Sequence, residues 1–188
     1  MLINVYDFDN TIYRGDSSYD FYMHCRRKYP RVRRDVLGAV PLMIDFAIHR
    51  RDKTRSKQRF YHYLSFVPDM EREVAEFWST REANLKQWYL EQKRKDDLII
   101  SASPVFLLKP VCDRLGVTLI ASKVDPKTGL YDGRNCHDEE KVRRLRAERP
   151  EVEIDQFYSD SLSDAPLARI AKEAFFVKDD EITPFPSV

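Results

Sequence analysis

From Asp97 onward, short apolar segments alternate with segments of helical periodicity. The apolar segments cover residues 97–101, 117–121, 154–159 and 174–177, and the helical segments cover residues 104–115, 139–148 and 165–172. This alternation is typical of parallel βαβ units. Gly116 directly follows the first of these helices, at the position where glycine commonly ends a helix. The pattern predicts an α/β fold with a parallel sheet, followed by a loosely ordered tail after Asp180.

The first predicted strand, residues 2–6, is separated from the others by a long helical block. Asp16 can cap a helix that begins near Ser17, and Asp69 can cap a long helix whose apolar stripe runs from Met70 to Tyr89. Further helices are predicted over residues 32–50 and 54–66, and a hairpin excursion over residues 123–135. We expect a Rossmann-like, three-layer core made of residues 1–15 and 94–188, with an all-helical cap, residues 16–93, inserted after the first strand.

Two carboxylates, Asp7 and Asp9, stand at the end of the first predicted strand. Side chains at positions i and i+2 of a strand point to the same face. Open α/β sheets bind ligands at the C-terminal ends of their strands. Carboxylates this close repel each other unless a cation or a proton lies between them. The pair therefore predicts a bound Mg²⁺, a hard ion that prefers oxygen ligands; the alternative is a simple turn at a strand end.

The overall composition excludes several classes of protein. With 188 residues, 43% of them hydrophobic, the chain can form a real core in one domain with a sizeable insertion. Its net charge of +1 gives the whole chain no preference for nucleic acid. Cys25, Cys112 and Cys136 are odd in number and far apart, which indicates reduced thiols. Because no signal peptide is evident and the most apolar stretch, residues 36–48, is too short for a membrane span, we expect a cytoplasmic protein.

Polar residues also follow the other predicted strands or open the helices after them. Ser101 comes directly after one strand, Lys141 lies in the first turn of a helix, and Asp160 and Asp164 follow another strand. In a parallel sheet these positions converge on the edge that holds Asp7 and Asp9. Each of two roles has a second candidate. Ser103 is the rival of Ser101, although we expect it to cap the next helix, and Lys123 is the rival of Lys141.

The four segments resemble the motifs of the haloacid dehalogenase superfamily of phosphohydrolases, in its phosphoserine-phosphatase-like branch. In chain order the matching segments are D-F-D-N-T from Asp7, I-I-S-A-S-P around Ser101, C-H-D-E-E-K-V with Lys141 as its lysine, and S-D-S-L-S-D from Ser159. Residues 16–93 are similar to the helical cap of this branch, and residues 119–166 also resemble bacterial phosphatidylglycerophosphatase C. Asn10 and Ser159 stand where many relatives have glycine; asparagine also accepts turn conformations.

The resemblance implies a Mg²⁺-dependent phosphatase that forms an aspartyl-phosphate intermediate. Asp7 would be the nucleophile, and Asp9 would act first as general acid and then as general base. Asp7, the backbone carbonyl of Asp9, and Asp160 would hold the metal, with Asp164 supporting them from behind.

The resemblance also implies which residues bind the phosphate. Ser101 would donate a hydrogen bond to a phosphoryl oxygen, and Lys141 would neutralise the phosphate charge. Thr11 is grouped with them and is expected to steady the first loop through its hydroxyl.

The predicted cap carries a strong basic bias. Residues 24–59 contain twelve Lys and Arg against three Asp. A basic segment around an apolar stretch suits a polyanionic soluble substrate or peripheral contact with an anionic membrane. Asp16 lies near the position where phosphoserine phosphatases bind the substrate amine, and Arg59 is the candidate for their carboxylate-binding arginine. We expect a phosphorylated small metabolite such as phosphoserine; a phospholipid head-group phosphate and a non-catalytic phosphate-binding protein are the alternatives.

Overall fold

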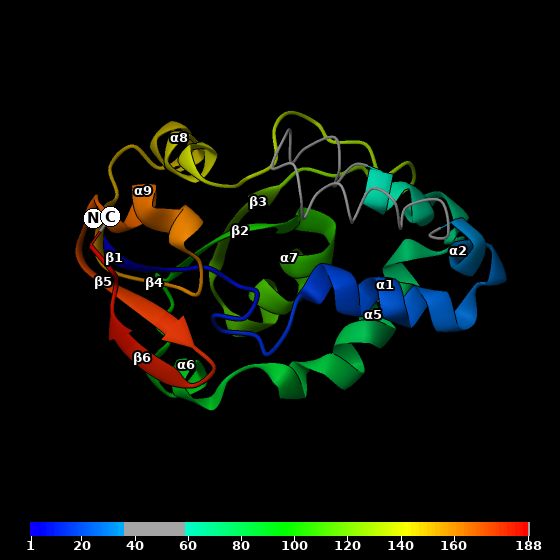
Figure 1. Cartoon of the computed structure of the whole chain (residues 1–188), viewed down its shortest axis with the longest axis horizontal. Coiled ribbons are helices and arrows are strands. Elements are labelled where there is room, and N and C mark those ends of the chain that lie inside the picture. Colours follow the sequence, from blue (N-terminus) through cyan, green and yellow to red (C-terminus); the bar gives the residue numbers. More distant parts are fainter. Residues whose placement is uncertain (36–58, 188) are drawn as a thin grey trace.

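The structure is a computed structural model that describes residues 1–35 and 59–187. The described residues form a six-stranded sheet in the order β3-β2-β1-β4-β5-β6. Strands β1 to β5 pair in parallel, and β6 pairs antiparallel with β5 (Figure 1). The α/β fold with a parallel sheet is confirmed. The strands are β1 (Leu2–Tyr6), β2 (Leu98–Pro104), β3 (Thr118–Ser122), β4 (Glu153–Ser159), β5 (Ala171–Lys178) and β6 (Glu181–Pro184).

Helices precede or follow most of the strands. Between β1 and β2 the described helices are α1 (Ser17–Lys28), α2 (Pro30–Asp35), η2 (His62–Phe66), α5 (Met70–Arg81), η3 (Glu82–Asn84) and α6 (Gln87–Gln92). After β2 they are α7 (Val105–Leu115), α8 (Glu139–Glu148), η4 (Leu162–Asp164) and α9 (Ala165–Ala168). Asp16 caps α1 and Asp69 caps α5 as predicted, because each carboxylate accepts a hydrogen bond from a backbone N–H in the first turn.

Strand β1, in the interior of the sheet, is buried on both faces. Val5 packs in a cluster with Leu145 of α8 and Leu167 of α9. Tyr6 packs in another cluster, which includes Leu108 of α7 and the helices inserted between β1 and β2. Helices therefore cover both faces of the sheet, which gives the predicted three layers (Figure 1).

The helical insertion is anchored to the layer formed by α7. Trp78 of α5 is fully buried, and its indole N–H donates to the carbonyl of Leu107 over 2.7 Å. In Figure 1 helices α1, α2 and α5 extend to the right, away from β5 and β6. The predictions for residues 36–58, including the helix over residues 32–50 beyond Asp35 and the start of the helix at Thr54, lie outside the described residues. The division into a core and a cap stays a prediction.

The long helix predicted from Met70 to Tyr89 is wrong, because it is three elements. Helix α5 ends at Arg81, η3 follows, and α6 begins only at Gln87. Between them, Leu85 forms an antiparallel bridge with Tyr13, and the N–H of Lys86 donates to the carbonyl of Ile12 over 2.8 Å. The chain must be extended at Leu85 to make these bonds to the loop after β1, so the helix cannot continue.

The C-terminal segment also differs from the prediction. Helix α9 covers only Ala165–Ala168, and β5 starts at Ala171, three residues before the expected strand. The expected loose tail instead forms β6, which pairs with β5 through a tight turn at Asp179 and Asp180. Asp179 has φ 54°, a conformation that Asp tolerates better than most residues.

Candidate active site

Three neighbouring strands bring the predicted site residues to one edge of the sheet. Asp7 directly follows β1 and Asp160 directly follows β4, and the N–H of Asp7 donates to the carbonyl of Tyr158 over 2.9 Å. Ser101 lies on β2, the other neighbour of β1. It does not follow the strand as expected, because β2 continues to Pro104 with a shift of register after Ser101. Convergence at the carboxyl ends is what a parallel sheet produces.

Lys141, in the first turn of α8, forms the centre of a buried ionic group. Its ammonium donates to Asp7 Oδ1 and to Asp164 Oδ2, each over 2.7 Å. The side chains of Lys141 and Asp164 are each 2% exposed. Burial lowers the pKa of Lys141, but the two carboxylates outweigh it, so that the pKa lies above its ordinary value and the amine stays charged. The rival residue, Lys123, is an exposed side chain.

Asp164 is held in place from two sides. Its Oδ2 accepts hydrogen bonds from Lys141 and from the hydroxyl of Ser159, both over 2.7 Å. Asp164 directly precedes α9, but its side chain makes no capping bond to that helix. Ser159, noted in the sequence only as a departure from a common glycine, is thus a supporting residue of this group.

Asp7 carries more negative charge around it than Lys141 can balance. Burial, together with the Asp164 and Asp160 carboxylates, raises the pKa of Asp7 to about 7 against the lowering effect of Lys141. Burial and Asp164 also raise the pKa of Asp160. Three carboxylates, those of Asp7, Asp160 and Asp164, therefore lie around the single ammonium of Lys141. Such a set of oxygen donors fits a divalent hard cation such as Mg²⁺.

The carboxylate of Asp9 points to another part of the structure. Its Oδ1 accepts from the backbone N–H of Ser17 over 2.7 Å, and its Oδ2 accepts from the hydroxyl of Ser103 over 2.5 Å. Burial, and then the nearby Asp16 carboxylate, raise the pKa of Asp9 to about 6, although the bonds from Ser103 and Ser17 lower it. The role of the Asp9 backbone carbonyl as a metal ligand stays a prediction. The two acids of the D-F-D segment therefore have different partners: Asp7 accepts from the Lys141 ammonium, and Asp9 accepts from a hydroxyl and a backbone amide.

The loop after β1 is braced against the loop after β4. Asn10 has φ 55°, the turn conformation expected of it. The Thr11 hydroxyl accepts from the N–H of Asp160 over 3.0 Å and donates to Asp160 Oδ1 over 3.3 Å. These bonds steady the loop through the Thr11 hydroxyl, as expected, while its place among the phosphate-binding residues stays a prediction. A cavity of about 610 Å³ borders Asn10 and Asp160, with Lys86 and Lys178 in its wall.

Ser101 and Ser103 have different surroundings. Ser101 is buried, and its hydroxyl accepts from the N–H of Ser103 over 3.0 Å, so its own proton remains for a further acceptor. Ser103 was expected to cap the following helix, and this is wrong: α7 has no side-chain cap, and the Ser103 hydroxyl bonds to Asp9. Sequence reasoning missed this role, although the i, i+2 spacing of the two serines on a strand was a usable signal.

Asp16 and Arg59 are the two residues predicted to recognise the substrate. Asp16 is exposed and uses Oδ1 to cap α1, accepting from the N–H of Tyr19 over 2.9 Å. Arg59 is an exposed side chain shortly before η2. Their roles in substrate binding stay predictions.

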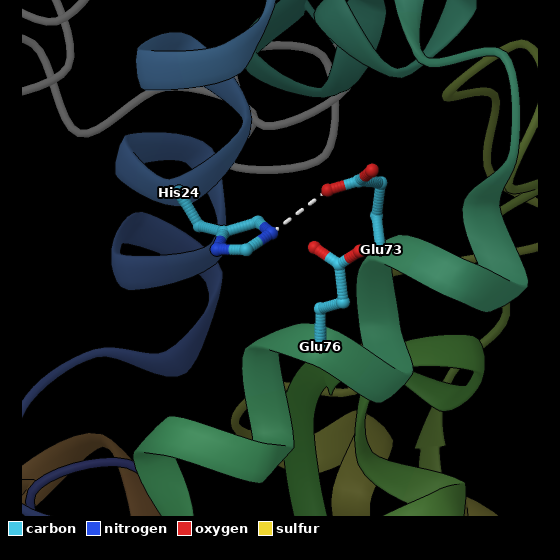
Figure 2. A group of neighbouring side chains, drawn as sticks. All are labelled: His24, Glu73 and Glu76. Carbon is cyan, nitrogen blue, oxygen red and sulfur yellow. Dashed lines mark hydrogen bonds and ion pairs between the residues drawn. The ribbon is translucent and has the colours of Figure 1, made fainter.

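A second group of metal-type ligands, His24, Glu73 and Glu76, lies between α1 and α5 (Figure 2). Glu73 Oε2 bonds to His24 Nε2 over 2.8 Å and accepts from the Lys28 ammonium over 2.7 Å. Lys28 also bonds to Glu76. A cation of the chain itself already occupies the place between the two carboxylates, so we interpret this group as a structural link between the helices.

Comparison with known proteins places the chain in a family. A model of the haloacid dehalogenase-like hydrolase family matches residues 5–169. A histidinol-phosphatase of Neisseria meningitidis serogroup C (strain 8013) is 35% identical over 98 residues, which are 45% of this chain and 44% of that protein. The chain thus spans less than half the length of this relative.

Solved structures share the fold. A protein of unknown function from Bordetella pertussis Tohama I has a TM-score of 0.77 at 20% identity, covering 92% of this chain and 88% of that one. A phosphoserine phosphohydrolase-like protein from Francisella tularensis subsp. tularensis SCHU S4 has a TM-score of 0.58 at 15% identity, covering 93% and 86%. At these identities the likeness concerns the fold.

Proposed function

The chain belongs to the haloacid dehalogenase-like hydrolase family, and from this premise we propose that it is a phosphatase, which hydrolyses a phosphate monoester of a small metabolite through an aspartyl-phosphate on Asp7. The observation that carries the proposal is the buried Asp7–Lys141–Asp164 group, with Asp9 held separately beside it. A protein that only binds phosphate needs no general acid, so it has no need for a second carboxylate such as Asp9, held close to Asp7 by separate hydrogen-bond donors.

In the proposed reaction the residues of the chain act in two steps. The Asp7 carboxylate, oriented by Lys141 on its Oδ1, attacks phosphorus, the bond to the leaving oxygen breaks, and that oxygen takes a proton from Asp9. Asp9 then removes a proton from a water molecule, whose oxygen attacks phosphorus and releases Asp7 and inorganic phosphate. Ser101 and Lys141 donate to the phosphoryl oxygens, and Thr11 and Ser159 hold Asp160 and Asp164 in position.

We further propose that Asp7, the backbone carbonyl of Asp9, and Asp160 hold Mg²⁺. When bound, the ion would supply the positive charge that a negatively charged nucleophile and a phosphate need in order to approach each other. Magnesium should raise the melting temperature of the wild type, because a ligand that binds only the folded state stabilises it. Asp160→Asn should abolish this rise; an equal rise in the variant would contradict the assigned site.

The experiment that tests the function is phosphate release from a panel of monoesters, with Mg²⁺ and with EDTA. The panel contains phosphoserine, histidinol phosphate, a sugar phosphate, a nucleotide and phosphatidylglycerophosphate. Release should need the metal and be absent in Asp7→Asn, whereas Asp113→Asn, at an exposed position of α7, should retain it. If the wild type releases phosphate from none of these compounds, the result would favour the non-catalytic alternative.

One observation keeps a second candidate, a phospholipid head-group phosphatase, in view. Five exposed arginines lie on the last turn of α1 and on α2: Arg26, Arg27, Arg31, Arg33 and Arg34. Exposed arginines in this density attract anionic surfaces. Within the described residues no helix has the length and apolar character needed to cross a membrane. Sedimentation with anionic and with neutral vesicles separates the candidates: equal binding to both removes the lipid reading. The cytoplasmic location stays a prediction.

A further inference from the structure

A line of three hydroxyl groups leads from Asp9 into the helical insertion. Ser103 Oγ, at the end of β2, lies 2.5 Å from Asp9 Oδ2. Ser18 Oγ, on α1, lies 2.9 Å from Ser103 Oγ. The hydroxyl of Tyr61, just before η2, lies 2.8 Å from Ser18 Oγ. Three segments far apart in the sequence therefore meet in one hydrogen-bonded chain that ends on this carboxylate.

The direction of every bond in this chain follows from counting protons. A serine or tyrosine hydroxyl has one proton to donate. Ser103 donates its proton to Asp9, so Ser18 must donate to Ser103, and Tyr61 must then donate to Ser18. Burial raises the pKa of Tyr61 well above its ordinary value, so its proton stays in place. Each bond strengthens the next in such a chain, and all three point toward the carboxylate.

The chain is enclosed and its far end is fixed. Ser103, Ser18 and Tyr61 are 3%, 7% and 2% exposed. The Tyr61 ring lies 6.0 Å from the Tyr131 ring, centroid to centroid, and its backbone carbonyl approaches Gly129 so closely that a side chain there would collide with it. Buried hydroxyls held in this way have little freedom to turn elsewhere, which makes the chain suitable for holding a carboxylate in one orientation.

We propose that Ser103, Ser18 and Tyr61 form a positioning relay that aims the Asp9 carboxyl at the leaving oxygen of the substrate. The relay fixes Oδ2 while the Ser17 N–H fixes Oδ1. Each carboxyl oxygen has a second lone-pair position, so Asp9 can accept both bonds and still carry the proton that it transfers. The proposal rests on the function of Asp9 proposed above and adds the residues that orient it.

Leaving-group dependence distinguishes such a relay from a purely structural role. An alkoxide leaves poorly without a proton, whereas the phenolate of p-nitrophenyl phosphate leaves readily without one. Misaligning the acid should therefore reduce kcat/KM mainly for an alkyl monoester. We expect Ser103→Ala to lower kcat/KM for the best alkyl substrate about 10-fold to 100-fold more than for p-nitrophenyl phosphate. Tyr61→Phe removes a hydroxyl that is two hydrogen bonds farther from Asp9 than that of Ser103, so it should change the ratio in the same direction but by less.

Two matched variants serve as controls. Tyr63→Phe makes the same chemical change at a buried tyrosine two residues away whose hydroxyl is not part of the relay, and Ser65→Ala removes an exposed hydroxyl that bonds to the His62 carbonyl. Both should leave the ratio of the two kcat/KM values unchanged. Melting temperatures confirm that each variant is folded; should Ser103→Ala fail to fold, Tyr61→Phe carries the test.

The possible results separate the relay from the function. A wild type active on both substrates, with Ser103→Ala and Tyr61→Phe reducing both activities equally, overturns the relay and leaves the phosphatase standing. A wild type inactive on both substrates overturns the proposed function, and the relay with it. A selective loss on the alkyl substrate in both relay variants, absent in the controls, supports both.

Discussion

At the scale of single residues, the site depends on one buried cation. Lys141 lies between Asp7 and Asp164 and bonds to both over 2.7 Å. A carboxylate that loses its partner inside a protein keeps its desolvation cost without compensation. The charge of this lysine thus contributes to stability as well as to any chemistry at the sheet edge.

Replacing that cation should destabilise the metal-free protein strongly. We expect Lys141→Met to lower the free energy of unfolding by about 3–5 kcal/mol at pH 8, measured by urea denaturation in EDTA. At pH 5 the loss should be smaller, because the carboxyls can then take up protons. Lys123→Met, at the exposed rival position, should change stability by less than about 0.5 kcal/mol. Similar losses for both variants would refute this role.

The sequence could place the charged residues of the site but not its serines. The acids Asp7, Asp160 and Asp164 and the cation Lys141 could be placed because strand ends in a parallel sheet meet at one edge. Ser103 and Ser159 could not, since a serine hydroxyl bonds equally well to a helix end, a turn or a carboxylate. Only the positions of their neighbours in space decide among these partners.

At the scale of elements, α1 and α5 are joined through Glu73 (Figure 2). The Glu73 side chain is fully buried, and its oxygens accept from Lys28, Tyr29 and His24. Burial would raise the pKa of Glu73, but these hydrogen bonds outweigh it and lower the pKa from 4.5 to about 2. The folded state therefore binds a proton at Glu73 less readily than the unfolded state does.

The lowered pKa predicts how stability depends on pH. Because the pKa is depressed on folding, the contribution of Glu73 is fully present above pH 4.5 and is lost as the pH falls toward 2. This contribution to the free energy of unfolding is on the order of 3 kcal/mol. Glu73→Gln should be less stable than the wild type at pH 7, and the difference should shrink in urea denaturation series down to pH 3.

A neighbouring glutamate provides the control for this measurement. Glu71→Gln changes an exposed residue in the first turn of α5 and should keep the pH profile of the wild type. The pKa of Glu140 is also lowered to about 2, chiefly by a hydrogen bond from Arg143. Its contribution to the pH dependence of stability is therefore the same in the wild type and in both variants. Parallel profiles for the wild type and Glu73→Gln would contradict the prediction.

At the scale of the whole molecule, the segment after β3 supports the helical insertion. Gly129 has φ 75°, and a Cβ added to it would collide with the backbone carbonyl of Tyr61. Gly133, four residues later, has φ 90° and nothing within 4 Å of such an atom. The two glycines thus share the left-handed conformation but differ in their surroundings, which makes them a matched pair.

Alanine at each position separates backbone strain from steric contact. We expect Gly133→Ala to lower the free energy of unfolding by about 1–2 kcal/mol through strain alone. Gly129→Ala should lose about 1–3 kcal/mol more, because the added methyl group displaces Tyr61. Equal losses in thermal or urea unfolding would show that Tyr61 is not held by this contact.

The sequence alone determined the order of strands and helices from β2 to β5, the caps at Asp16 and Asp69, and the acids and lysine at the sheet edge. These features depend on local periodicity, local capping and the geometry common to all parallel sheets. The tertiary structure alone decided that the chain opens at Leu85, that the last residues form β6, and that Ser103 serves Asp9. In each case a backbone or hydroxyl group had several possible partners, and its choice depended on residues distant in sequence, brought close only by folding.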